Sequence, residues 1–368
     1  MTAASRSPFD VVARVLSERL HGCKASEELR ALVGSPGTSW PRVLSYAGAE
    51  YVLPAFAAAL RDLGLIGSLD RELGAFLEAV HRANVERNGE IGNELEAAVG
   101  VLNRAGIEPV LLKGAIRLVD ELYPDHGWRM LRDIDLLIPP TSLAEVIRAF
   151  GEVGYIHLNL SGNEIQRLGG LVQIDLHDEL FSRLLPATEV IEASRSAALG
   201  NGRVRLPSIE HQLVHLIGHS QIRHRGHACG LIALRDRLEA AALVSWGHEN
   251  VDWQSVEARF RAAGYRRPLL TFLLALKDCA LCALPVPARI DLLTALQLHR
   301  VALQARSTTF AHIGALAGWC GSEVKSQLAE RDAGRPRAIK NLKRLLFERG
   351  AACKMARALG RRRWFLRA

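Results

Sequence analysis

The spacing of hydrophobic residues divides this chain into helical ends and a middle part of different character. Over residues 1–105, apolar residues recur every three to four positions, which predicts helices with one buried face. The same spacing returns from residue 208, where Ser208 is expected to cap a helix. The helices expected in the first part cover residues 9–20, 40–50, 52–64 and 70–105, the last with a bend at Gly89 and Gly92.

Short apolar runs beside Gly and Pro residues mark the middle part, and such runs are typical of buried strands. A helix is expected directly after Gly114 and must end before Pro124, and another is expected from Thr141. The strands are expected in residues 106–114, 132–138, 154–160 and, as the last strand, 170–180. Strands that alternate with helices in this way predict a small mixed α/β domain.

These patterns together predict an α+β protein with a small mixed-sheet core between helical regions. The chain has 368 residues, 49% of them hydrophobic, which is enough to fill more than one apolar core. We expect a helical region at 1–105, the α/β core at 106–207, a helical domain at 208–330 and a basic tail at 331–368.

Positive charge is concentrated at the carboxy terminus. The net charge is +8, yet residues 331–368 hold 13 Lys and Arg against Asp332 and Glu348, a net +11, so the rest of the chain carries −3. The spacing of leucines in the tail indicates an amphipathic helix with a basic face, a type that binds nucleic acid or anionic surfaces. A solvated helix without a partner is the simpler interpretation.

The composition is that of a protein of the reducing cytoplasm. The first residues lack the basic-then-apolar order of a secretory signal, and six cysteines in this length predict free thiols. Lys277 and Asp278 interrupt the most apolar stretch, residues 269–286, so we expect a buried helix and no transmembrane segment. Cys279 and Cys282 lie in this stretch without a second ligand pair nearby, which favours core packing over zinc binding.

Two acidic residues lie inside the predicted strand RDIDLLI (132–138). Because residues i and i+2 of a strand point to the same face, Asp133 and Asp135 project together while Ile134 faces the other side. Two neighbouring carboxylates repel each other, and a divalent cation such as Mg²⁺ relieves that repulsion. Asp175, in a later apolar strand, supplies a third carboxylate. The three aspartates are therefore the candidate metal ligands and catalytic residues.

Glycine and basic residues near these aspartates suit the phosphates of a nucleotide. Lys113 and Gly114 stand where a strand passes into a helix, and the backbone N–H groups at a helix start bind phosphate. Arg129 and Arg132 precede Asp133 and offer guanidinium groups to phosphate oxygens. We expect these two arginines, with Lys113 and Gly114, to bind the nucleotide.

Several histidines are candidates for supporting roles. His177 shares a strand face with Asp175 and is a candidate to orient that carboxylate, although a solvated or core position is equally compatible with the sequence. His211, His215 and His219 recur every four residues on one helical face, a spacing that can bind zinc. Their leucine and isoleucine neighbours favour a packed, hydrogen-bonded row, from which His219 is the candidate to face the catalytic cleft.

The order of these motifs resembles a known group of proteins. A strand ending in glycine, a helix, a strand with two aspartates and a later strand with one aspartate resemble the DNA polymerase β-type nucleotidyltransferase superfamily. More narrowly, LLKG, RMLRDIDLLI and VQIDLHDEL look like the bacterial nucleotidyltransferase-like family of uncharacterised nucleotidyltransferases. The resemblance covers about residues 100–285.

The resemblance implies roles for individual residues. Asp133 and Asp135 would hold the metal ions, Asp175 would act as general base or complete the second metal site, and Gly114 would lie at the triphosphate. The superfamily usually has serine after this glycine, whereas this chain has Ala115, so one hydroxyl ligand for phosphate is missing. Lys113 is the candidate to compensate.

The implied activity is the Mg²⁺- or Mn²⁺-dependent transfer of a nucleoside monophosphate from an NTP to a hydroxyl or phosphate acceptor, through a two-metal displacement. A small-molecule or peptide acceptor is favoured over RNA, because the positive charge is confined to one terminus. Two alternatives stay open. One is a catalytically impaired nucleotide-binding scaffold, which Ala115 favours, and the other is a nucleic-acid-binding protein that acts through the basic tail.

Overall fold

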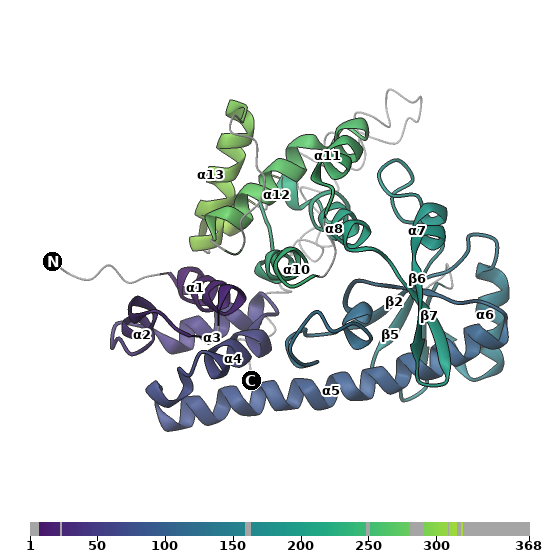
Figure 1. The fold of residues 1–368 in the computed structure, drawn as a ribbon, viewed down its shortest axis with the longest axis horizontal. Helices are drawn as coiled ribbons and strands as arrows, with labels where there is room; N and C mark the ends of the chain where they lie inside the picture. The colour runs from purple at the N-terminus through teal and green to yellow at the C-terminus, as the bar shows by residue number, and fades with distance from the viewer. Residues whose placement is uncertain are drawn as a thin grey trace, which may run out of the picture.

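The computed structural model describes residues 7–314 and 318, apart from residues 23, 159–162, 248–250, 280, 282–289 and 308. The basic tail expected at 331–368 and Cys282 therefore lie outside the described residues. Figure 1 shows the described elements in a group of amino-terminal helices, a sheet with its own helices, and a group of carboxy-terminal helices. The predicted α+β class is confirmed.

The amino-terminal group consists of short helices and one long helix. Their bounds are α1 Pro8–His21, α2 Glu27–Val33, α3 Trp40–Ala49, α4 Leu53–Asp62 and α5 Arg71–Arg104, with a 3₁₀ turn η1 at Ile66–Ser68. The helices predicted from apolar spacing correspond to α1, α3, α4 and α5, whereas α2 was not predicted. Asp70 caps α5 by accepting hydrogen bonds from the backbone N–H groups of Glu72 and Leu73.

The long helix α5 runs unbroken through Gly89 and Gly92. Figure 1 shows it without a kink, so the predicted bend is wrong. A side chain at either glycine would meet no neighbouring atom, which means that neither glycine marks a close approach of another element. The helix stays regular because its first half packs against the amino-terminal helices and its second half packs against the sheet.

Within the described residues, seven strands form one mixed sheet in the order β3-β4-β5-β2-β1-β7-β6. The strands are β1 Val110–Leu112, β2 Asp133–Leu137, β3 Tyr155–His157, β4 Glu164–Arg167, β5 Gln173–His177, β6 Arg195–Leu199 and β7 Gly202–Leu206. Strand β2 lies at the centre, antiparallel to β1 and parallel to β5. Helices α6 Leu143–Glu152 and α7 Ala187–Ala193 belong to the same part of the chain.

The middle part differs from the prediction in several details, and strand β4 and helix α7 were not predicted at all. After Gly114 the chain forms only a 3₁₀ helix, η2 (Lys113–Leu118), and the side chain of Arg117 pairs with Asp120 and with Glu239 of a distant helix. The strand predicted at 170–180 is also not the last one. Strands β6 and β7 follow as a hairpin whose turn contains Gly200 with φ +53°.

The carboxy-terminal group is helical. Its elements are α8 Ile209–Ile217, a π-helical turn η3 Gly218–Arg223, α9 Gly226–Cys229, α10 Leu234–Ser245, α11 Trp253–Ala262, α12 Arg266–Asp278 and α13 Leu292–Arg306. The predicted cap is confirmed, because the Ser208 hydroxyl accepts a hydrogen bond from the backbone N–H of His211 at 3.2 Å. Cys279 is buried, and its sulfur accepts a hydrogen bond from Arg237. Among the described helices, none is long and apolar enough to cross a membrane.

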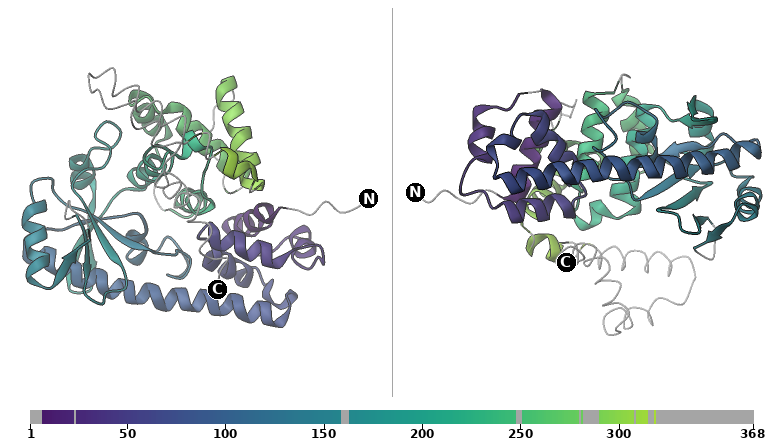
Figure 2. Two further views of the ribbon diagram at one scale, coloured as in Figure 1. Left: turned by 180° about the vertical axis from the view of Figure 1, so that it is seen from behind. Right: turned by 90° about the horizontal axis from the view of Figure 1, so that it is seen from below.

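Buried apolar side chains of the described part gather in two clusters. One cluster joins the amino-terminal and carboxy-terminal helices and contains Phe56 and Phe272. The other lies between the sheet and the helices α5 and α6, and contains Leu95 and Ile134. Figure 2 shows α5 passing from the amino-terminal helices to the sheet. The boundaries expected after residues 105 and 207 stay predictions.

Candidate active site

The central strands β2 and β5 bring the candidate carboxylates together. Asp135 lies opposite Asp175 in the parallel ladder, so both side chains stand on one face of the sheet. Asp133 and His177 lie two residues away on the same strands and therefore on the same face. Ile134, between the two aspartates, is fully buried on the other face. The apolar side of the strand thus fixes the position of the acidic side.

Asp135 is the most buried member of this group, with only 1% of its surface exposed. Its Oδ1 atom accepts a hydrogen bond from Lys113 Nζ at 2.5 Å and lies 2.8 Å from Nε2 of His177. Burial acts to raise the pKa of Asp135, but the hydrogen bonds and charges of His177 and Lys113 outweigh it and hold that pKa well below its usual range. The Asp135 carboxylate is therefore ionised at neutral pH, and His177 contacts it through the ring nitrogen.

The pKa of Asp175 is shifted in the opposite direction to that of Asp135. Gln173 donates a hydrogen bond to its Oδ1 atom at 2.6 Å, yet burial and the negative charges of Asp135 and Asp133 raise the pKa of Asp175. Ligand atoms of Asp135, Asp175 and His177 all lie within 4.8 Å of one another. A partly buried carboxylate pair with unfavourable charge fits an oxygen-preferring divalent cation such as Mg²⁺ or Mn²⁺.

Asp133 lies half-buried at the start of β2. It is outside the group of ligand atoms formed by Asp135, Asp175 and His177. Its charge nevertheless contributes to the raised pKa of Asp175, which places it close to that carboxylate. Asp133 is thus the more accessible of the two β2 carboxylates and can complete a metal site from its open side.

The turn from β1 into η2 lies beside these carboxylates. Lys113 has φ +50°, in the left-handed region that residues with a side chain rarely adopt. A Cβ atom at Gly114 would clash with Cδ2 of Leu131, so a larger residue here would have to displace that leucine side chain. Ala115, which follows Gly114, is buried in the apolar cluster under the sheet.

The two arginines expected near the nucleotide have partners other than the aspartates. Arg129 forms an ion pair with Glu239 of α10 at 3.0 Å. Arg132 lies over the ring of Tyr51, 5.0 Å from its centroid, in a cation–π contact. Their role in nucleotide binding stays a prediction.

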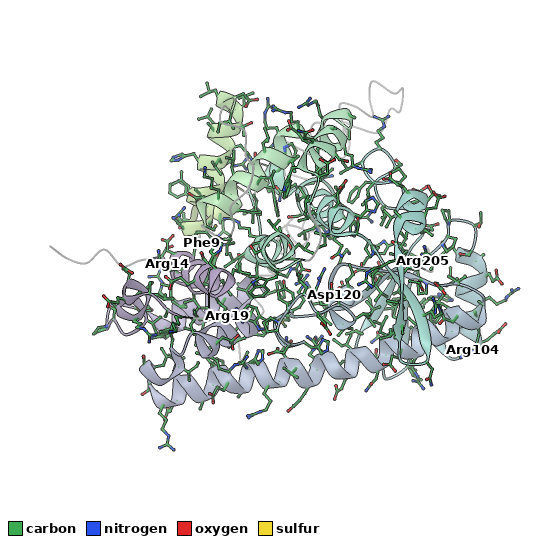
Figure 3. The ribbon with its side chains drawn as sticks, in the orientation of Figure 1. Phe9, Arg14, Arg19, Arg104, Asp120 and Arg205 are labelled. Carbon is green, nitrogen blue, oxygen red and sulfur yellow. The ribbon has the colours of Figure 1, made fainter. Side chains whose placement is uncertain are left out.

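A buried polar cluster ties η2 and the segment after it to helix α10. Arg117 pairs with Asp120 at 2.5 Å and with Glu239 at 2.9 Å, and the Tyr123 hydroxyl donates a hydrogen bond to Glu239 at 3.0 Å. Figure 3 labels Asp120 in this region, between the sheet and the carboxy-terminal helices. These pairs hold helix α10 against η2, the element that begins with Lys113.

A small cavity lies between Lys113 and the helices α8 and α10. Its volume is about 50 Å³, and His215, His219, Arg129 and Glu239 are among the residues that line it. This volume holds a few water molecules. Apolar side chains, among them Ile116 and Leu216, share its lining with the charged and polar ones.

The histidines of α8 and η3 do not act as one ligand set. His211 pairs with Glu189 at 3.3 Å, while His215 is buried and its pKa falls to about 3, first through burial and then through nearby positive charge. Nε2 of His219 lies 3.0 Å from Nε2 of His224. The π-helical turn brings these two rings together, because its backbone bond joins residues five apart at 2.9 Å. No triad of metal-ligating groups in the described residues includes them.

The fold and the site can be compared with known proteins. A family model described as "Uncharacterised nucleotidyltransferase" matches residues 36–280, which is more than half of the chain and includes the whole sheet. The chain belongs to the uncharacterised nucleotidyltransferase family. No match was found among curated proteins or among solved structures. Membership supports nucleotidyl transfer as the general class of activity.

Two polar residues near the candidate site were not predicted from the sequence. Gln173 precedes Asp175 by two positions, so the period of a strand was a signal that could have placed it beside that carboxylate. Glu239 forms ion pairs with Arg117 and Arg129, which lie far from it along the chain. No local pattern in the sequence predicts these ion pairs.

Proposed function

We propose that the protein transfers a nucleoside monophosphate from an NTP to a hydroxyl group of a small molecule or peptide, with Mg²⁺ or Mn²⁺ held by Asp133, Asp135 and Asp175. The observation that carries the proposal is the register of β2 and β5, which sets Asp135 opposite Asp175 with Asp133 on the same face. Family membership supports the same class of reaction. A divalent ion bound there would neutralise the phosphates and lower the pKa of the attacking hydroxyl.

Asp175 is suited to receive the proton of the acceptor. In the proposed step the acceptor oxygen attacks the α-phosphorus, the bond from that phosphorus to the bridging oxygen breaks, and pyrophosphate leaves. A carboxylate has two oxygens, so one oxygen of Asp175 can face the metal ion while the other receives the proton. In the protein without metal the pKa of Asp175 is raised, which is the direction that a general base needs. Asp135, whose pKa is lowered, stays ionised throughout and keeps its place as an anionic ligand.

The turn at Lys113 and Gly114 is the proposed place of the triphosphate. The absence of a side chain at Gly114 allows close packing, and the Lys113 ammonium carries a positive charge beside the carboxylate face. An ammonium has three donors, so Lys113 can contact Asp135 and a phosphate oxygen at the same time. Arg129 and Arg132 are proposed to contribute positive potential from a greater distance.

Transfer of label from an NTP tests this proposal. Each NTP, labelled at the α-phosphate, is incubated with the full chain, Mg²⁺ and the low-mass fraction of a cell extract. We expect label in a product other than the nucleotide and an equal release of pyrophosphate. Asp133→Asn should lower the rate by about 100-fold, the effect of losing roughly 3 kcal/mol of transition-state stabilisation.

A matched variant and a binding measurement separate the alternatives. Glu78→Gln changes an exposed carboxylate of α5 and should keep the wild-type rate. Binding of Mg²⁺ and NTP without any transfer of label would favour the scaffold, which the buried Ala115 in place of a hydroxyl also supports. Absence of both binding and transfer would contradict the proposed function.

A further inference from the structure

Lys113 occupies the place beside Asp135 where a cation is needed. Its Nζ atom lies 2.5 Å from Oδ1 of a carboxylate that is 1% exposed, and its own side chain is 22% exposed. Leu112, the residue before it, pairs with Asp135 in the antiparallel ladder of β1 and β2. The ammonium therefore reaches the carboxylate from the neighbouring strand and is held there by the sheet.

The backbone at Lys113 has a conformation that residues with a side chain rarely adopt. In the described part of the chain, positive φ values at residues other than glycine occur at Tyr51, Lys113 and Arg225. Such a conformation costs of order 1 kcal/mol and persists only where the surroundings fix it. Strain at a residue that contacts a buried carboxylate indicates a functional constraint on where that side chain points.

The charges on the carboxylate face favour one divalent ion in the free protein. Asp133, Asp135 and Asp175 together bring three negative charges, and Lys113 brings one positive charge. A single divalent ion then makes the group neutral, whereas two divalent ions would leave an excess of positive charge. Oδ1 of Asp135 is already engaged by Lys113 and His177, so it is not free to bridge two metal ions.

We propose that Lys113 takes the place of one of the two metal ions expected for this superfamily, so that the free protein binds a single divalent cation on the face formed by Asp133, Asp135 and Asp175. The inference rests on the proposed function, since it concerns the same metal site. It departs from the two-metal displacement that the sequence implied. Like a second metal ion, the Lys113 ammonium could contact Asp135 and a phosphate oxygen at the same time.

The number of bound Mn²⁺ ions tests this inference without any enzymatic assay. Free Mn²⁺ is titrated into the full chain and counted by electron paramagnetic resonance. We expect one ion per wild-type chain and one per Lys113→Arg chain, because arginine keeps the positive charge. Lys113→Met removes the charge and should bind two ions, or bind its first ion at least tenfold more tightly.

Thermal unfolding of the same variants provides a second readout. Without metal, Lys113→Met should melt at a lower temperature than wild type, because Asp135 loses a charge partner in a buried position. Added Mn²⁺ should restore more stability to this variant than to wild type. Lys277→Met, which removes an exposed lysine of α12, is the matched control and should behave like wild type.

Several outcomes would overturn the inference. Two ions on the wild-type chain would show that Lys113 does not replace a metal. A count and affinity for Lys113→Met equal to those of wild type would show the same. The proposed function is judged separately by transfer of label from NTP, so an active enzyme with two bound ions would refute only the role given to Lys113.

Discussion

At the scale of single residues, Asp175 is held where its negative charge is unfavourable until a cation binds. Burial and the neighbouring Asp135 and Asp133 raise its pKa, so the fold disfavours its ionised form. We expect Asp175→Asn to stabilise the metal-free protein by about 1 kcal/mol at pH 7.5, since functional sites commonly sacrifice stability. The asparagine oxygen can still accept the hydrogen bond from Gln173.

Melting temperatures with and without Mn²⁺ check this prediction. Added Mn²⁺ should raise the melting temperature of wild type and of Glu78→Gln, but should have little effect on Asp175→Asn. A lower melting temperature for metal-free Asp175→Asn would contradict the view that this carboxylate is strained by its neighbours.

His215 makes the stability of the protein depend on pH. Burial lowers its pKa from 6.5 to about 3, so the folded protein favours the neutral ring. Between these two values the unfolded chain binds more protons than the folded one, and stability therefore rises with pH. The contribution is complete above pH 6.5 and is lost as the pH falls toward 3, with a loss of about 2 kcal/mol by pH 5.

Urea unfolding at pH 7.5 and pH 5.0 measures this effect. His215→Gln should lose less stability than wild type between the two pH values, because it removes the group that gains a proton on unfolding. His299→Gln, which changes an exposed ring of α13, should keep the wild-type difference. Equal differences for all three proteins would remove His215 as the source.

At the scale of elements, helix α8 depends on its cap. The Ser208 hydroxyl accepts from the backbone N–H of His211 and so satisfies a donor at the start of the helix. We expect Ser208→Ala to lower the free energy of unfolding by about 1 kcal/mol in urea titrations, whereas Ser208→Asp should keep most of it. An alanine variant as stable as wild type would show that the cap is not needed.

The elements also show what the sequence could and could not predict. Regular spacing predicted α1, α5 and the strand of Asp133 and Asp135, because one buried face dictates the pattern. The helix expected after Gly114 is instead a short 3₁₀ helix, and its Arg117 pairs with Glu239, a contact between distant segments that no local pattern marks. The hairpin at Gly200 had a local signal in its Gly-Asn-Gly turn that was overlooked.

The site shows the same division between local and distant causes. The period of two in a strand placed Asp133, Asp135 and Asp175 on predictable faces, while the register of β2 and β5 decided that Asp135 faces Asp175. Register depends on the whole sheet and could not be read from either strand. The contact of Lys113 with Asp135 likewise depends on a backbone conformation with φ +50° that the sequence did not reveal.

At the scale of the whole molecule, the basic tail is predicted to be separate from the chemistry. Removal of residues 338–368 should leave NTP binding and transfer to a small acceptor nearly unchanged, because the candidate site residues lie far earlier in the chain. Filter binding of RNA by full-length and shortened protein at two salt concentrations is the measurement. Tight, salt-sensitive RNA binding that is lost on truncation would instead favour an RNA acceptor.

Helix α5 is shared by both apolar clusters, since Leu77 lies in one and Leu95 in the other. Neither cluster can melt without exposing part of the same helix, so we expect calorimetry to show one transition with equal calorimetric and van't Hoff enthalpies. Two separate transitions would contradict this. If the molecule unfolds as one unit, a ligand that binds at the sheet stabilises every helix. It should therefore slow hydrogen exchange in α1 and α4, although neither helix contacts the ligand.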